Sequence, residues 1–122
     1  MTRDPQRLSD YLAHIREAIE RIDRYTHDID EVAFLNQPMV QDAVIRNIEI
    51  IGEASHNIEK RYPAFCAAHP ELPLSLAYEM RNAVAHGYFK VDYEIVWRTL
   101  HRDLPGFHGQ IVALMTASPG TK

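Results

Sequence analysis

Apolar residues recur at three- and four-residue steps through most of this chain, which is the spacing of one face of an α-helix. The first stripe follows Asp4-Pro5, where aspartate suits a helix N-cap and proline suits the first helical position. Its members are Leu8, Tyr11, Leu12, Ile15, Ala18, Ile19, Ile22 and Tyr25. This pattern predicts a long amphipathic helix with one buried stripe.

A second long helix is predicted to begin at Pro38, after a break over 26–30 and a short helical turn over 31–35. Its stripe consists of Val40, Val44, Ile48, Ile51, Ala54 and Ile58. Ile45 and Ile50 fall off that stripe. A helix that is apolar on more than one side either lies at the centre of its fold or is covered by a second chain, and both alternatives stay open here.

The spacing predicts a third main helix over 74–86, ended by Gly87, and a fourth helix capped by Asp92. Their inward residues are Leu74, Ala77, Met80 and Val84 in the third helix, and Tyr93, Val96, Trp97, Leu100 and Leu104 in the fourth. Pro105 is expected to start a last helix, which carries Phe107, Ile111 and Leu114. Methionines 39, 80 and 115 are expected to fill gaps in the core.

No segment alternates between apolar and polar residues as a strand would, and no internal repeat is visible. The sequence therefore predicts an all-α fold, an up-down bundle of four to five helices. With 122 residues the chain has the length of one domain. We place that domain at 1–117 and expect a frayed C-terminal tail at 118–122.

Composition and apolar patterning indicate the cellular compartment of this domain. The hydrophobic fraction of 46% and the charged fraction of 25% are ordinary for a soluble globular protein. No apolar run approaches the ~18 residues of a membrane span, and the N-terminus lacks the apolar region of a signal peptide. The single cysteine, Cys66, excludes an internal disulfide framework. We therefore expect a cytoplasmic protein with no membrane partner.

The net charge of −4 argues against broad, nonspecific binding of nucleic acid. The charges are unevenly distributed: acids outnumber bases ten to three over 17–59, whereas bases outnumber acids six to four over 60–102. The second half could offer a locally positive surface around His86. An uneven but solvated distribution explains the same counts, so charge alone leaves the choice open.

Three chemically capable side chains gather over 81–88, at the end of the third predicted helix. Arg81 is a permanent cation with a planar donor fork suited to phosphate, His86 can move a proton near neutral pH, and Tyr88 presents a hydroxyl. On an ideal helix Arg81 and His86 diverge by about 140°. They converge if the helix ends between them or if two copies meet across a dimer axis. A surface arginine, a helix-end histidine and a core tyrosine remain the alternative.

The order Arg81-Asn82, His86-Gly87-Tyr88 resembles the RX4HXY motif of HEPN-domain proteins and, more narrowly, that of the HepT-like (DUF86) toxins. The likeness extends past the motif. Ile51-Gly52-Glu53-Ala54 resembles the Gly-Glu-Ala segment of that family, and 91–97 resembles the segment after the motif. The coarse helix order also fits along most of the chain.

Two departures from the family pattern concern local packing and substrate fit. The segment 73–79, before the motif, has no tryptophan where many relatives have one. Ala83 and Ala85 are smaller than the residues common at those positions. Neither departure touches the chemistry.

The resemblance implies a HEPN-like bundle that acts as a metal-independent RNA endonuclease, the toxin of a type VII-like HEPN/MNT toxin–antitoxin pair, with no cofactor. In that scheme His86 takes the proton from a ribose 2′-hydroxyl, Arg81 neutralises charge on the attacked phosphate, and Asn82 is a supporting hydrogen-bonding residue. Tyr88 is the site where the partner, an MNT-type nucleotidyltransferase antitoxin, attaches AMP and silences the enzyme. HEPN domains typically form homodimers in which both Arg/His sets line one cleft.

Two other pairs of side chains have spacings that resemble parts of metal sites, but neither pair makes a complete site. Glu53 and His56 have the Glu-x-x-His spacing of half a carboxylate di-iron site, but the sequence has no second such pair. Glu53 is therefore expected to support the cleft or the helix packing. Cys66 and His69 supply too few ligands for zinc, so no metal site is predicted.

Two histidines and one further function complete the predictions. His101 and His108 are expected on two different helices as surface or helix-end residues, although His101 could edge the cleft.

The alternative function is a non-catalytic nucleotide-binding or scaffold subunit for a small nucleotidyltransferase. An intact set of Arg81, His86 and Tyr88 favours the enzyme, since a scaffold need not keep both catalytic side chains.

Overall fold

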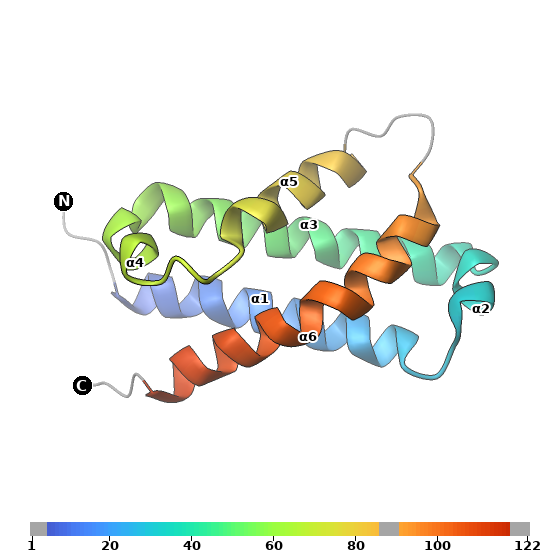
Figure 1. Cartoon of the computed structure of the whole chain (residues 1–122), viewed down its shortest axis with the longest axis horizontal. Helices are drawn as coiled ribbons and strands as arrows, with labels where there is room; N and C mark the ends of the chain where they lie inside the picture. The colour runs from blue at the N-terminus through green and yellow to red at the C-terminus, as the bar shows by residue number, and fades with distance from the viewer. Residues whose placement is uncertain (1–4, 86–90, 118–122) are drawn as a thin grey trace.

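The computed structural model describes residues 5–85 and 91–117, and within them it contains helices and no strand. The helices are α1 (Pro5–Thr26), α2 (Glu31–Leu35), α3 (Pro38–Arg61), α4 (Pro63–Ala68), α5 (Leu74–Ala85) and α6 (Tyr93–Ala117). The long helices α1, α3, α5 and α6 run alternately in opposite directions along the molecule (Figure 1). The predicted all-α, up-down bundle is therefore confirmed. The domain limits stay a prediction, because the tail at 118–122 lies outside the described residues.

Short polar and proline signals stand at the starts of α2, α3 and α6, which begin where the sequence predicts. Asp30 caps α2, its carboxylate accepting a hydrogen bond from the Ala33 amide at 2.9 Å. Pro38 occupies the first position of α3, where its missing amide hydrogen is not needed. Asp92 precedes α6 and accepts from the amides of Glu94 and Ile95 at 3.1 and 3.3 Å, as predicted for its cap.

Helix α3 lies at the centre of the bundle, because it packs against α1 on one side and α5 on the other, while α6 crosses the bundle and contacts α1 (Figure 1). Ile45 and Ile50, the residues off the main stripe of α3, are half-buried against the core. The central position thus accounts for much of the apolar character of α3 within one chain. Whether a second chain covers the remainder stays a prediction.

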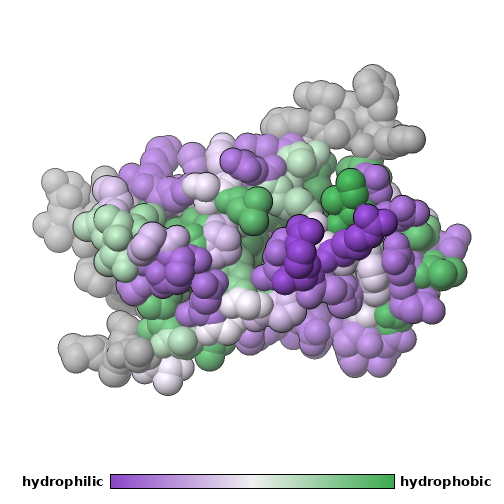
Figure 2. Space-filling model, viewed as in Figure 1, coloured by the Kyte–Doolittle hydropathy of each residue, from purple (hydrophilic) through white to green (hydrophobic). Residues whose placement is uncertain are grey.

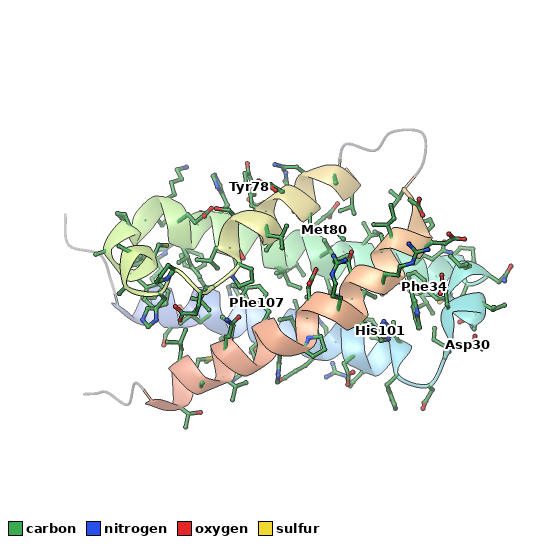
Figure 3. The ribbon with its side chains drawn as sticks, in the orientation of Figure 1. Asp30, Phe34, Tyr78, Met80, His101 and Phe107 are labelled. Atoms are coloured by element: carbon green, nitrogen blue, oxygen red, sulfur yellow. The ribbon has the colours of Figure 1, made fainter. Side chains whose placement is uncertain are left out.

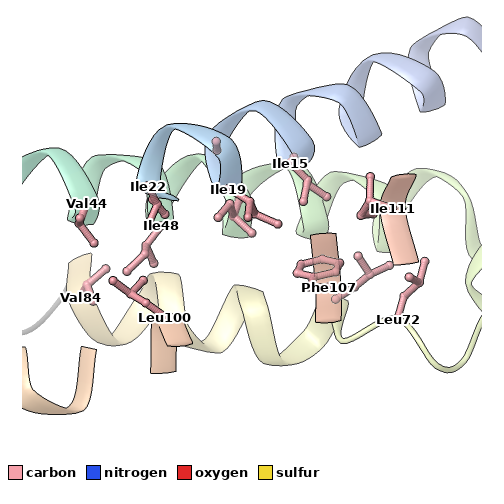
Figure 4. Close-up of a cluster of buried hydrophobic side chains, with 14 of the residues drawn as sticks. Ile15, Ile19, Ile22, Val44, Ile48, Leu72, Val84, Leu100, Phe107 and Ile111 are labelled. Carbon is pink, nitrogen blue, oxygen red and sulfur yellow. The ribbon is translucent and has the colours of Figure 1, made fainter. Parts of the chain in front are cut away.

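The core fills the interior between the four long helices. Buried side chains from α1, α3, α5, α6 and the segment before α5 share it: Ile15, Ile19, Ile22, Val44, Ile48, Leu72, Val84, Leu100, Phe107 and Ile111 (Figure 4). Phe34 of α2 is fully buried, and its ring centre lies 6.1 Å from that of Tyr93 and 5.2 Å from that of Trp97 (Figure 3). These aromatic contacts join α2 to the start of α6.

One helix boundary predicted from the sequence is wrong. Pro105 lies inside α6, which continues from Tyr93 to Ala117 without a break. The prediction relied on the missing amide hydrogen of proline, which costs about 3 kcal/mol in a helix interior. Burial overrides that cost, because Leu100, Phe107 and Ile111 keep one helical phase across the proline and all enter the core.

Two residues and one short helix also differ from the prediction. Tyr25 was placed in the stripe of α1, but its side chain is exposed and Thr26 is buried in its place, with its hydroxyl donating to the Ile22 carbonyl. Met39 is 84% exposed and fills no core gap, whereas Met80 and Met115 do pack against the core. Helix α4, a short helix opened by Pro63, was not predicted.

Candidate functional site

Helix α5 presents two different sides, and only one of them carries polar chemistry. Tyr78 and Met80 lie on opposite sides of the helix (Figure 3). The side with Met80 faces α6 across an apolar groove. The side with Tyr78 meets α3 through polar contacts: Tyr78 stacks on His56 with ring centres 4.0 Å apart, and the Ser75 hydroxyl donates to the Glu59 carboxylate.

Arg81 lies on the polar side, four residues before α5 ends at Ala85. The helix comes close to α3 there, because the facing residue is Gly52, which has no side chain. A Cβ built at Gly52 would overlap the Cβ of Arg81 and would lie 2.8 Å from its Cγ and 2.9 Å from the Ala77 carbonyl oxygen. Gly52 therefore makes room for the stem of Arg81.

The guanidinium of Arg81 is held by two partners. Its Nη2 lies 3.3 Å from Oε1 of Glu53, and its Nη1 donates to Oδ1 of Asn82 at 3.0 Å. Glu53 and Asn82, both predicted as supporting residues, thus contact Arg81 directly. Among the described residues no acceptor bonds the buried Nε of Arg81.

An open depression of about 260 Å³ lies beside Arg81 and crosses three helices. Its lining includes His14 and Tyr11 of α1, Arg46 of α3, and Arg81 itself. Sequence reasoning did not single out His14 or Arg46. No local pattern marks them, because only the packing of α1 and α5 on either side of α3 brings them to one surface.

The charges around this depression are nearly balanced. Arg46 lies 3.9 Å from Glu49, and Arg81 pairs with Glu53. Glu53 is 61% exposed and Arg81 29%, so their attraction is well screened and contributes little stability. The pair therefore adds little to the stability of the fold.

The remaining predicted members of the motif cannot be placed. His86 and Tyr88 lie outside the described residues, as does Gly87, the predicted end of the third helix. The structure brings Arg81, Asn82 and Glu53 together, and it says nothing of the two residues that complete the motif. Their roles remain predictions.

Of the two pairs with metal-like spacing, Glu53–His56 adjoins Arg81 through Glu53. His56 and Glu53 both face α5 partners, and no group of three histidine, cysteine or acidic side chains suited to a metal occurs in 5–85 and 91–117. Burial, reinforced by the charge of Glu59, raises the pKa of the Cys66 thiol. That keeps the thiol in the form that binds metals poorly.

His101 and His108 share one helix, contrary to the prediction that a break at Pro105 separates them. Both line a hollow of about 500 Å³ between α6 and α1. His108 Nε2 lies 2.9 Å from Oε2 of Glu20. The hydrogen bond from His108 is the largest cause that lowers the pKa of Glu20, with Arg16 adding to the effect.

The groove between α5 and α6 has a volume of about 130 Å³ and is mainly apolar. Leu76, Met80 and Phe107 line it, and Arg102 and Asp103 border it. Figure 2 shows apolar atoms exposed in the middle of this face, next to strongly hydrophilic ones. Among the described residues of α5 itself, those that line this groove carry no group that could transfer a proton or bind phosphate.

The fold and the Arg81 site together define a class of protein. It is an all-α bundle in which Arg81 and Arg46 line an open depression, and guanidinium groups suit an anionic group such as a phosphate diester. No helix in the described part of the chain is both long and apolar enough to cross a membrane.

Comparison with known proteins identifies the family. The family model described as "Ribonuclease HepT-like" matches residues 15–114, so the chain belongs to the HepT-like ribonuclease family. It is 42% identical over 105 residues to "Probable ribonuclease HepT" of Thermococcus cleftensis, covering 86% of this chain and 93% of that protein. No solved structure matches the chain.

Two further relatives carry RNase names. A protein of Caldanaerobacter subterraneus is 31% identical over 105 residues, which cover 86% of this chain and 91% of that protein. A Methanocaldococcus jannaschii protein, whose name joins a gamma-glutamylcyclotransferase to an RNase, is 39% identical over 105 residues. The match covers 86% of this chain and 46% of that longer protein.

Proposed function

We propose that this chain is a metal-independent RNA endonuclease, the toxin of a HEPN/MNT toxin–antitoxin pair. The observation that carries the proposal is the placement of Arg81, which lines an open depression and whose guanidinium contacts Glu53 and Asn82. Membership in a ribonuclease family gives that arginine a substrate, the phosphate diester of RNA.

The proposed reaction uses the nucleophile that RNA itself supplies. His86 takes the proton from a ribose 2′-hydroxyl, the 2′-oxygen forms a bond to the adjacent phosphorus, and the bond to the 5′-oxygen breaks. The leaving 5′-oxygen takes up a proton from water, and a 2′,3′-cyclic phosphate remains. Arg81 stabilises the negative charge that grows on the phosphate oxygens, so this reaction needs no metal-activated water.

We further propose that a partner protein controls the ribonuclease activity by modifying Tyr88, the last residue of the motif. An MNT-type nucleotidyltransferase antitoxin would attach AMP to the Tyr88 hydroxyl and release pyrophosphate from ATP. The new phosphodiester adds one negative charge seven residues after Arg81, where it would compete with the RNA phosphate. Intact-mass measurement after co-expression should show added AMP on the wild type and none on Tyr88→Phe. Modification at another residue would overturn the assignment to Tyr88.

We also propose that two copies pair to build the cleft. The surface of α3 that includes Ile50 and Glu53 also lines the Arg81 depression, so a second copy there would bring its own Arg81 to the same cleft. Light scattering should give about twice the monomer mass. A clean monomer at micromolar concentration would overturn the shared cleft.

The decisive test is cleavage of a mixed-sequence RNA by purified protein in EDTA. Wild type should cut and leave cyclic phosphate ends, whereas His86→Ala should lose about 10²–10⁴-fold in rate. His27→Ala is the matched control, because His27 is an exposed histidine at the end of α1 and should cut normally. An RNA with 2′-deoxy positions should resist.

The same assay separates the enzyme from the scaffold alternative. A scaffold for a nucleotidyltransferase would bind its partner but leave RNA intact in EDTA and in magnesium alike. Cleavage that requires magnesium and survives in His86→Ala would contradict the proposed mechanism, because neither the 2′-hydroxyl route nor its base would then be needed.

A further inference from the structure

We propose that Gly52 and Glu53 form a seat for Arg81, in which Gly52 sets the position of the arginine stem and Glu53 sets the direction of its guanidinium. Neither residue needs to touch RNA, so both are positioning residues. The inference rests on the proposed ribonuclease function, because it explains how that arginine is held ready for a phosphate.

The position of Gly52 within a long helix requires an explanation. Glycine is a poor helix former, since it loses more backbone freedom than other residues on folding. Gly52 lies near the middle of α3 and is buried. A Cβ there would overlap the Cβ of Arg81 and press on the Ala77 carbonyl, so the clash involves the stem and backbone of α5 rather than a flexible side-chain end.

Any side chain at position 52 must therefore move α5 away from α3. The distance between packed helices depends on the side chains at their contact. A shift of α5 carries Arg81 with it and stretches the 3.3 Å contact between its Nη2 and Glu53 Oε1. The guanidinium would then lie at a different distance from α3 and point in a different direction.

The other described glycines provide the contrast. Cβ atoms built at Gly106 and Gly109 of α6 meet nothing within 4 Å. Alanine at those two positions should raise the melting temperature or leave it unchanged, because it improves helix propensity without a clash. Gly52 is thus the described glycine whose lack of a side chain places a functional group.

The first test compares Gly52→Ala with Gly106→Ala and Gly109→Ala by RNA cleavage, circular dichroism and thermal unfolding. We expect Gly52→Ala to lose about 10²-fold in kcat/KM, the effect of misplacing a catalytic group by about 1 Å. Most of the loss should lie in kcat. The two α6 variants should keep wild-type activity. Folded Gly52→Ala with normal cleavage would overturn the seat.

A double variant shows whether Gly52 acts through Arg81. Arg81→Lys keeps the Cβ, so the clash with an alanine at position 52 remains, but the planar fork is gone. Adding Gly52→Ala to Arg81→Lys should lower the melting temperature as much as in wild type yet cost little further activity. Fully additive activity losses would show that Gly52 only maintains the fold, which contradicts the proposal.

Glu53→Gln provides a second route if Gly52→Ala does not fold, since Glu53 is largely exposed and its loss should not unfold the chain. We expect a fall of about tenfold in kcat, as for the loss of one charged partner. Glu94→Gln, which removes a similarly exposed carboxylate paired with Arg98 at 3.7 Å, is the matched control. Increased cleavage by Glu53→Gln would mean that Glu53 competes with phosphate, and would overturn its part in the seat.

The two proposals fail in different ways. No cleavage by wild type under any condition would overturn the ribonuclease function itself. Cleavage by wild type together with full activity in both Gly52→Ala and Glu53→Gln would overturn only the seat, and leave the function in place.

Discussion

The contact between α3 and α5 differs from the contact between α1 and α6 in how closely the helices approach. At the first, Gly52 lets α5 come so near that no Cβ fits between the helices. At the second, a hollow of about 500 Å³ remains, and the His108–Glu20 pair lies at its edge. Both contacts also contribute apolar side chains to the one core.

The difference separates two tasks of the same bundle. A close, glycine-dependent contact leaves a side chain little freedom, which suits a group that must meet a phosphate with the right orientation. An open contact tolerates changes in its lining, and we expect it to matter for the stability of the fold. We therefore expect substitutions at the α3–α5 contact to affect cleavage and those at the α1–α6 contact to affect stability alone.

Between the two helix contacts, the largest expected effect is that of Arg81→Ala on RNA cleavage. Removing a donor that stabilises charge in the transition state typically costs about 10²–10³-fold in kcat. Thermal unfolding should change little, because the Arg81–Glu53 pair is partly exposed. Initial cleavage rates and melting curves of the same preparation measure both quantities.

Arg98→Ala is the control for Arg81→Ala. Arg98 also pairs with a glutamate, at 3.7 Å, but it lies on α6 and is 65% exposed. The Arg98→Ala variant should therefore cleave RNA at the wild-type rate. Equal losses in the two variants would mean that general positive charge, rather than the seated fork of Arg81, attracts the RNA.

The next effect concerns Pro105 at the α1–α6 hollow. Pro105→Ala restores the amide hydrogen inside α6, which favours the folded state. It also makes the unfolded chain more flexible, which offsets part of that gain. The net stabilisation should be about 1–2 kcal/mol. Cleavage should not change. Urea unfolding measures the gain, and Pro38→Ala, at the first position of α3, should show none. A less stable Pro105→Ala would mean that α6 needs the proline to fit across α1.

Pro105 also shows what sequence patterns settle in this fold. The apolar stripes placed α1, α3 and α5 well, because burial of one face determines where a helix persists. At position 105 the proline signal predicts a helix start, although Leu100, Phe107 and Ile111 remain in phase across it. Phase was the stronger signal, since it reports the burial that offsets a lost hydrogen bond.

The candidate site was predictable only where its residues are neighbours in sequence or belong to a recognisable motif. Arg81 and Asn82 came from the motif, and Glu53 came from its resemblance segment without a partner assigned. That Glu53 pairs with Arg81, and that His14 lines the same depression, depends on how α1 and α5 pack on α3. Helical periodicity gives the face of a residue but not which helix it meets.

The smallest expected effect concerns the acid stability of the α1–α6 contact. The pKa of Glu20 is lowered, first by the hydrogen bond from His108. The unfolded chain therefore binds a proton to Glu20 at a higher pH than the folded chain does. The resulting stability is fully present above the ordinary glutamate pKa of about 4.3. It is lost as the pH falls through the lower pKa of the folded state.

His108→Gln should remove most of that acid dependence. Because both side chains are about a third or more exposed, the contribution should not exceed about 1 kcal/mol at neutral pH. Urea unfolding at about pH 7 and about pH 3 should show a smaller loss on acidification in His108→Gln than in wild type. The control His27→Gln removes a histidine beside the exposed Asp28. It should lose as much stability on acidification as wild type does. Identical acid losses in all three proteins would show that apolar contacts alone hold α6 on α1, since the pair would then add nothing across the hollow.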